Sequence, residues 1–180
     1  MAAGDGLVSM TPTSIAHSGT SASINADGGV DFTAVTELSL NGVFTSEMDN
    51  YLVVWNGSMN VAIITLLKLR AAGTDTTANY NYQQLLVDGT TRSGSRATGD
   101  PYALVADSGT TTSGETMHFY GPYLAQPTAI RTVSASSRNT ARIVDHAITQ
   151  SDSTQFDGFT LVPNSSREMT GTVHVFGYEE

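Results

Sequence analysis

The sequence contains no cysteine, few charged residues and no long apolar run. The missing cysteines exclude disulfide bonds, thiolate metal sites and a cysteine nucleophile. Charged residues make up 14% of the chain, against about 25% in an average soluble protein. No apolar stretch approaches the roughly 18 residues that indicate a membrane span, and the first residues lack the basic and apolar regions of a signal peptide. We therefore expect synthesis in the cytosol and no membrane partner.

The balance of charge argues against a further class of partner. Eight Lys and Arg residues against seventeen Asp and Glu residues give a formal net charge of −9. A chain with this balance lacks the positive charge that drives binding to a phosphate backbone. Nucleic acid is therefore not an expected partner.

The residues that are abundant favour strands and turns. Ser and Thr supply about a quarter of the chain and there are 17 glycines; Thr suits a pleated surface, whereas Gly and Ser suit turns. A polar but weakly charged surface fits a protein covered by other copies or by a larger assembly. It fits a secreted β-protein equally well, so composition leaves both interpretations open.

Short runs with period-two alternation predict strands along most of the chain. In residues 61–72, Leu67 and Leu69 alternate with Lys68 and Arg70, which favours a strand over a helix. Residues 50–57 are apolar on both faces and predict a central strand. Other predicted strands are 21–25, 29–35, 37–44, 115–124, 128–135, 141–148, 158–164 and 171–178. About eight core strands separated by turns predict an all-β, antiparallel, jelly-roll-like β-sandwich.

Two regions depart from this rhythm. Residues 1–28 have few large apolar side chains and are predicted to be an extended N-terminal arm that docks on a partner, before a sandwich domain at 29–180. The apolar residues of the arm that are candidates for partner contacts are Leu7, Val8, Met10 and Ile15. Residues 73–114 are polar and rich in Thr and Gly, and are predicted to be a long loop.

No motif in the chain indicates catalysis, a cofactor or a metal. Ser46, Glu47, Asp49 and Asn50 lack the spacing of a calcium loop and are interpreted as a turn that precedes a strand. No histidine has metal-ligand spacing, and neither G-x-S-x-G nor a phosphate loop occurs. Two strand histidines, at 118 and 174, would approach each other only if their strands pair.

Several side chains remain as candidate partner contacts. Tyr80 and Tyr82 lie among Asn and Gln, the composition of adaptable binding surfaces, and Tyr102 follows in the same predicted loop. Lys68 and Arg70 form a basic pair that would meet carboxylates of a shell protein or of a second copy. An ordinary solvated face explains the pair as well.

Six stretches in a fixed order carry a resemblance to a known class of protein. They are FTSEMDNYLVVW, LLKLRAAGTD, ANYNYQQ, YGPYLAQPTAIRTV, STQFDGFTLVP and MTGTVHVFGY. From about residue 35 onward, the chain resembles virion structural proteins of tailed, cyanophage-like bacteriophages, including domains of tail fibres. The resemblance implies a β-sandwich exposed on the virion, usually a homo-oligomer and often a trimer. It implies no catalytic residue.

Three functions from different classes follow as hypotheses. The first is a non-enzymatic capsid decoration or head-spike protein that binds the major capsid protein as a homo-oligomer. The second is a receptor- or glycan-binding head of a tail fibre or baseplate, with Tyr80, Tyr82, Tyr102 and residues 88–114 as its recognition surface. The third is a polysaccharide hydrolase, for which no carboxylate pair stands out.

Overall fold

Nearly all of the described chain is antiparallel β-structure. The computed structural model describes residues 6–136, 138 and 141–178. Within them, one turn of 3₁₀-helix is the only helix: η1, Asn164–Ser166. The strands are β1 Val8–Ser9, β2 Ser14–Ile24, β3 Val30–Asn41, β4 Asn50–Met59, β5 Ile63–Ala71, β6 Thr74–Asp75, β7 Tyr80–Asp88, β8 Thr91–Asp100, β9 Ala103–Ser108, β10 Ser113–Tyr120, β11 Thr128–Ser136, β12 Arg142–Gln150, β13 Gly158–Pro163 and β14 Met169–Tyr178.

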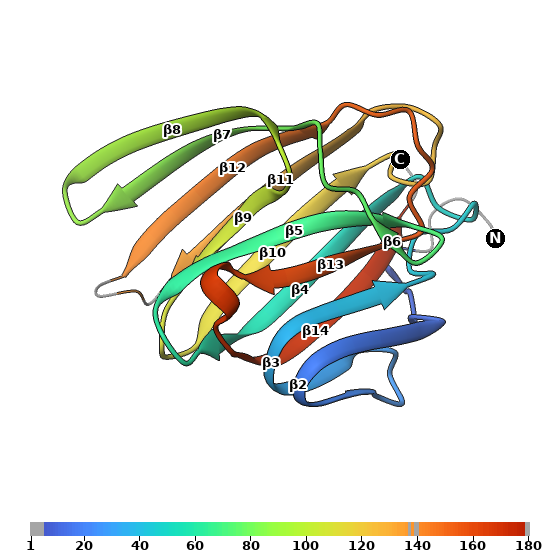
Figure 1. Cartoon of the computed structure of the whole chain (residues 1–180), viewed down its shortest axis with the longest axis horizontal. Coiled ribbons are helices and arrows are strands. Elements are labelled where there is room, and N and C mark those ends of the chain that lie inside the picture. Colours follow the sequence, from blue (N-terminus) through green and yellow to red (C-terminus); the bar gives the residue numbers. More distant parts are fainter. Residues whose placement is uncertain (1–5, 137, 139–140, 179–180) are drawn as a thin grey trace.

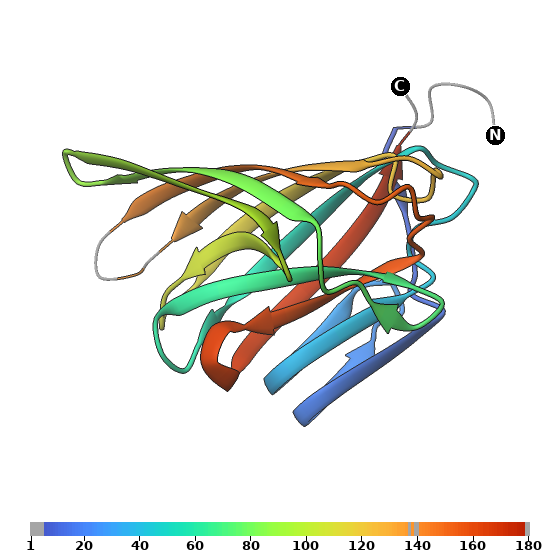
Figure 2. The ribbon, with the colours of Figure 1, turned by 45° about the horizontal axis from the view of Figure 1, so that its top comes forward.

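The strands form two layers (Figures 1 and 2). The larger layer has the order β3-β14-β4-β10-β11-β12-β7-β8, and the smaller has the order β3-β13-β5 with β6 and β9 beyond β5. Strand β2 pairs with β3 along its length. The prediction of an all-β antiparallel sandwich is confirmed, and β4 lies centrally between β14 and β10 as expected.

Strand β3 belongs to both layers. Its first half pairs with β14 and its second half pairs with β13, so the chain predicted as two strands at 29–35 and 37–44 is one strand that turns a corner. At the corner Ala34 has a φ of 48°, and its amide donates a hydrogen bond to Thr170 Oγ1 at 2.9 Å. Ladder shifts beside this point in β2 and β14 bend the sheet there.

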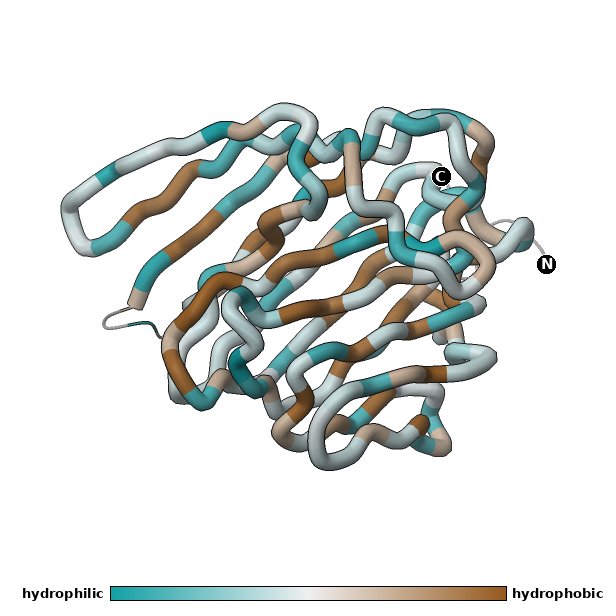
Figure 3. Tube along the Cα trace, viewed as in Figure 1, coloured by the Kyte–Doolittle hydropathy of each residue, from teal (hydrophilic) through white to brown (hydrophobic). Residues whose placement is uncertain are grey.

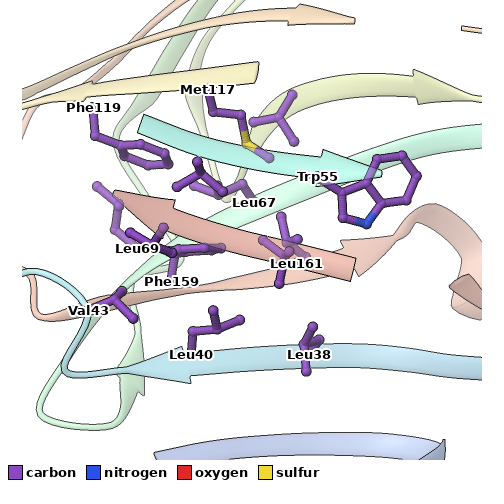
Figure 4. Close-up of a cluster of buried hydrophobic side chains, with 14 of the residues drawn as sticks. Leu38, Leu40, Val43, Trp55, Leu67, Leu69, Met117, Phe119, Phe159 and Leu161 are labelled. Carbon is purple, nitrogen blue, oxygen red and sulfur yellow. The ribbon is translucent and has the colours of Figure 1, made fainter. Parts of the chain in front are cut away.

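The core fills the space between the layers at β4, β10, β5 and β13. Trp55 and Met117 from the larger layer face Leu67 and Leu161 from the smaller layer, and all four are buried (Figure 4). The predicted alternation of β5 is confirmed, because Leu67 and Leu69 point into this core. Burial of these apolar side chains is the main favourable term in folding.

Residues 73–114 are not the long loop that the sequence predicts. They form β6, β7, β8 and β9 and the start of β10. Strand β9 is buried along its whole length beneath β11 and β12, whereas β7 and β8 extend the larger layer outward as a wing (Figure 1). The loop prediction is wrong because Thr and Ser fit an exposed strand surface as well as a loop.

The N-terminal segment is extended, as predicted, and it is ordered on its own chain. Val8 pairs with Gly177, and β2 pairs with β3 from Ser14 to Ile24. Residues 1–5 of the predicted arm lie outside the described residues. Docking of this segment on another protein remains a prediction.

A glycine next to the corner provides a test of this architecture. Gly19 has a φ of 119°, and an added Cβ would lie 2.2 Å from the carbonyl oxygen of Ala34. We expect Gly19→Ala to lower the free energy of unfolding by more than about 2 kcal/mol, from backbone strain and this clash. The measurement is the midpoint and slope of denaturant unfolding.

The control is a strand glycine without such a constraint. An added Cβ at Gly114 in β10 would meet no heavy atom within 4 Å, so Gly114→Ala is expected to leave stability nearly unchanged. Equal effects of the two substitutions would contradict the assignment of the corner.

Candidate functional surface

The outer face of the larger layer is an exposed surface built from six neighbouring strands. We use "outer face" for the side chains of β14, β4, β10, β11, β12 and β7 that point away from the smaller layer. Register places one row of them in the order Phe176, Leu52, His118, Arg131, Ala147 and Gln83. The strands are antiparallel and side chains alternate between faces, so this row lies on one side of the sheet.

Apolar side chains gather on the outer face toward the wing. Ile143 is 58% exposed, Leu85 is 53% exposed and Val133 is 39% exposed. Val133 and Leu85 lie in one row with Asp145 between them, and Ile143 lies two residues along β12 from Asp145. Figure 3 shows hydrophobic segments that continue into β12 and β7. Contiguous apolar exposure of this kind marks an interaction surface more often than scattered single residues do.

An ion pair occupies the middle of this apolar region. Arg131 Nη2 donates to Asp145 Oδ2 at 2.8 Å, and Nε donates to Oδ1 at 3.3 Å. The two side chains are 61% and 31% exposed, so the pair contributes little to stability. It leaves the centre of the outer face without net charge on a protein whose net charge is −9.

Aromatic and imidazole rings cover the other half of the outer face. His118 stacks on Tyr120 with an interplanar angle of 15° and meets Tyr178 edge-on, whereas His174 stacks on Phe176. The approach of the two histidines does not occur, because β4 separates β10 from β14. The rings add a second area suited to contact with a protein or a sugar.

A shallow depression lies at the end of this ring cluster. It is lined by Tyr120, Gly121, Leu124, Gln126, Pro127, Ala129, Asp49 and Asn50. The adjoining turn is held by Tyr51, whose hydroxyl accepts a hydrogen bond from the Thr45 amide at 2.7 Å and lies within bonding distance of the carbonyls of Thr45 and Met48. The interpretation of residues 46–50 as a turn is confirmed.

The basic pair of β5 is engaged within the chain. Arg70 forms an ion pair with Asp75, and its guanidinium also donates to Thr160 Oγ1 at 2.8 Å and to Asn41 Oδ1 at 2.9 Å. Lys68 Nζ lies 3.6 Å from Asp75. The prediction of Arg70 as a partner contact is wrong, because these bonds use its donors and its side chain is only 12% exposed.

The other predicted contacts divide between the core and the surface. Tyr80 is fully buried in β7, where its hydroxyl accepts a hydrogen bond from the Leu69 amide at 2.7 Å, so its assignment as a recognition residue is wrong. Met10 is also buried in the core. The remaining predicted residues are exposed or half-buried: Leu7, Val8, Ile15, Tyr82 and Tyr102.

A buried charge cluster joins β9 to the wing. Asp107, in β9, accepts hydrogen bonds from Arg138 and Arg142, each at 2.6 Å, and Arg142 also pairs with Asp88 in β7. Asp107 is almost fully buried. Because an uncompensated buried carboxylate is costly, these contacts hold β12 and β7 against β9.

Two further buried groups, beneath β9, have shifted pKa values. Burial raises the pKa of Glu115 to about 8, the Ser108 hydroxyl bond opposing this and Asp107 adding to it. Burial lowers the pKa of His146 to about 4. Its Nδ1 lies 3.0 Å from Thr132 Oγ1 and its Nε2 lies 3.1 Å from the Gln84 amide nitrogen, contacts that fit a neutral ring with its proton on Nδ1.

A metal site and a membrane-spanning helix each require a particular arrangement of residues. In the part of the chain that the structure describes, no three His, Asp or Glu side chains are placed to hold a metal ion. The same residues contain no helix of the length and hydrophobicity needed to cross a bilayer.

The comparisons with known proteins give little further information. No family model and no curated protein matches the chain. Among solved structures, the basic winged bean lectin with Tn-antigen is similar over 95% of this chain and 96% of that chain, with 6% identity and a TM-score of 0.31. So low a score supports no argument about fold or function.

The buried acid and imidazole predict how stability depends on pH. Because the pKa of Glu115 is raised, its contribution to the free energy of unfolding is lost as pH rises from about 4.5 to 8. Because the pKa of His146 is lowered, its contribution to the free energy of unfolding is lost as pH falls from about 6.5 to 4. The two effects offset each other between about 4.5 and 6.5. We expect stability from these groups to fall above pH 6.5, by about 1 kcal/mol per pH unit.

The substitution Glu115→Gln isolates the first of these effects. It keeps an acceptor for Ser108 and removes the ionisable group, so the decline between pH 6.5 and 8 is expected to disappear. Denaturant unfolding of both proteins across pH 4–9 measures this. An unchanged decline in the variant would contradict the assignment.

The charge cluster generates a separate prediction. Arg142→Met removes a cation from Asp107, whose side chain is 4% exposed, and is expected to lower the free energy of unfolding by about 3 kcal/mol. Arg131→Met breaks only the exposed pair on the outer face and is the matched control, with little expected change. Thermal and denaturant unfolding of the two variants would show the contrast, and similar losses would argue against it.

Proposed function

We propose that this chain is a non-enzymatic structural protein of a bacteriophage virion. In this proposal it is a homo-oligomeric decoration or head-spike protein that docks on the major capsid shell. The ordered set of stretches that resembles virion proteins of tailed phages motivates the phage setting. The outer face of the larger layer is the observation that carries the docking role.

The outer face suits a protein partner in shape and in charge. Ile143, Leu85 and Val133 present apolar area from three adjacent strands, and the single ion pair between them is balanced. Protein interfaces are depleted of charge at their centres and enriched in aromatic residues. The rings of Tyr120 and Tyr178 continue the same face with that second feature.

The buried ionisable groups support a structural role. Asp107 is buried within β9, and Glu115 and His146 are buried beneath it, with their hydrogen bonds directed to neighbouring strands. Catalytic groups need contact with a substrate, whereas these groups tie layers of the fold together. The exposed surface is thus left as the part of the molecule that meets partners.

A second candidate function has one observation in its favour. The depression at Tyr120 combines an aromatic ring with the carboxylate of Asp49 and the amide of Gln126. Aromatic rings beside planar polar groups are suited to a sugar, so a receptor- or glycan-binding head of a tail fibre is the alternative.

Copy number in the particle separates the two functions. We expect quantitative mass spectrometry of purified phage particles that carry this chain to find hundreds of copies per particle. A few copies per particle, together with retention of the pure protein on a glycan array, would favour the tail-fibre head. Absence of the chain from particles would overturn the virion assignment.

Docking through the outer face is tested with particles made without the chain. Added wild-type protein is expected to sediment with them, and Leu85→Asp with Ile143→Asp is expected to abolish this by placing charge in the apolar region. Val61→Asp is the control, because Val61 is 42% exposed in the turn between β4 and β5 and lies off the outer face. Equal sedimentation of all three proteins would contradict this use of the face.

A further inference from the structure

Strand β2 is a long sheet edge with an unusual composition. Its 11 residues, SIAHSGTSASI, include no Lys, Arg, Asp, Glu or Pro, in a chain with a net charge of −9. All are exposed or half-buried. Among the described strands β2 pairs with β3 alone, so its outer edge presents backbone N–H and C=O groups along a neutral strand. Proteins usually protect such an edge with charges or proline.

The opposite edge of the larger layer shows that contrast. Strand β8 lies at the other end of the molecule (Figures 1 and 2), and its 10 residues include Arg92, Arg96 and Asp100. Charged side chains on an edge strand are a common protection against pairing with a second copy. The fold therefore protects one of its two long exposed edges and leaves the other without charge.

Symmetry explains why a neutral edge suits a second copy of the same chain. A two-fold axis through an edge strand reverses its direction, so self-pairing is antiparallel, the more stable ladder. Only a residue on the axis lies opposite its own symmetry equivalent, so a charged residue there would face a like charge. The small side chains of β2 let a second backbone approach, and cross-strand Ser and Thr pairs add favourable contacts.

We propose that two copies of this chain pair through β2, antiparallel about a two-fold axis, to form one continuous sheet across both molecules. The inference rests on the homo-oligomeric assembly proposed above and names its contact. The ladder shift at Ser18 and Gly19 bends β2, so the axis lies within one of the straight segments, Ser14–Ser18 or Thr20–Ile24.

The absence of native cysteine makes this contact directly measurable. Each residue of β2 except Gly19 is changed singly to Cys in the full chain. A disulfide needs Cα atoms within about 7 Å, and each residue away from the axis adds about 3.3 Å per copy. We expect rapid oxidation to a covalent dimer at one position or two neighbouring positions. Ser93→Cys on β8 is the matched control and is expected to remain monomeric on a non-reducing gel.

Light scattering of the cysteine-free protein gives an independent readout. The wild type is expected to have about twice the chain mass of 18.9 kDa. Ser18→Lys or Ser21→Lys, whichever lies in the segment that cross-links, is expected to halve that mass by placing like charges near the axis. Ser93→Lys on β8 is expected to leave it unchanged. Circular dichroism of both variants establishes that they are folded.

Several outcomes overturn the pairing, and one separates the pairing from the virion function. Cross-linking at Ser93 in preference to β2, uniform cross-linking at every position, or a wild-type monomer would each do so. A trimer without β2 cross-links overturns the two-fold contact and leaves the proposed oligomeric function intact. A β2-linked dimer that is absent from phage particles supports the pairing and contradicts the virion function.

Discussion

The corner at Ala34 is the constraint on which the two-layer arrangement depends. Strand β3 pairs with β14 before the corner and with β13 after it, so this one strand fixes the position of the smaller layer over the larger layer. Ala34 reaches its left-handed conformation with the Thr170 hydroxyl bonded to its amide and with Gly19 pressed against its carbonyl. Because β2 follows β3 through the corner, the exposed edge of the sheet bends with it. The geometry of the core and the geometry of the edge therefore have one local cause.

Strands β11 and β12, which cover β9, reverse the usual distribution of polar and apolar residues. On β11 the buried face carries Thr132 and Ser134, whereas Val133 is exposed between them. On β12 His146 is buried and Ile143 is exposed. The inner polar groups are accommodated by bonds to β9, including Thr132 Oγ1 to the Val105 carbonyl at 2.7 Å. A shortage of space in the core does not explain why Val133 and Ile143 are exposed, since the core beneath them contains polar groups. In the function proposed above, the exposed apolar side chains meet a partner.

The same inversion sets the limit of what the sequence predicts. Alternation identified the fold class and the buried face of β5, because Leu67 and Leu69 point into the core and the basic residues lie on the opposite face of the strand. Alternation did not identify the outer face. A period of two shows which residues share a face of a strand, but not which face is buried. At β11 hydropathy predicts that the face with Val133 is buried, whereas that face is exposed. The prediction that Tyr80 is exposed rests on its Asn and Gln neighbours in the sequence. The prediction is wrong because the Tyr80 hydroxyl has a buried hydrogen-bond partner, the Leu69 amide. Pairing across 62 or more residues, as between Gln84 and His146, leaves no local signal.

Charge links the exposed features of the molecule. With seventeen acidic residues against eight basic ones, two copies repel each other. Salt largely screens this repulsion between charges more than about 8–10 Å apart, but much less between charges in close contact. Close association then requires surfaces where charge is absent or balanced. Strand β2 has no formal charge, and the centre of the outer face holds one cation paired with one anion. Basic residues elsewhere, such as Arg70 and Arg142, are used within the fold. Repulsion over the rest of the surface would disfavour association elsewhere. In the assembly proposed above, contacts are therefore limited to β2 and the centre of the outer face.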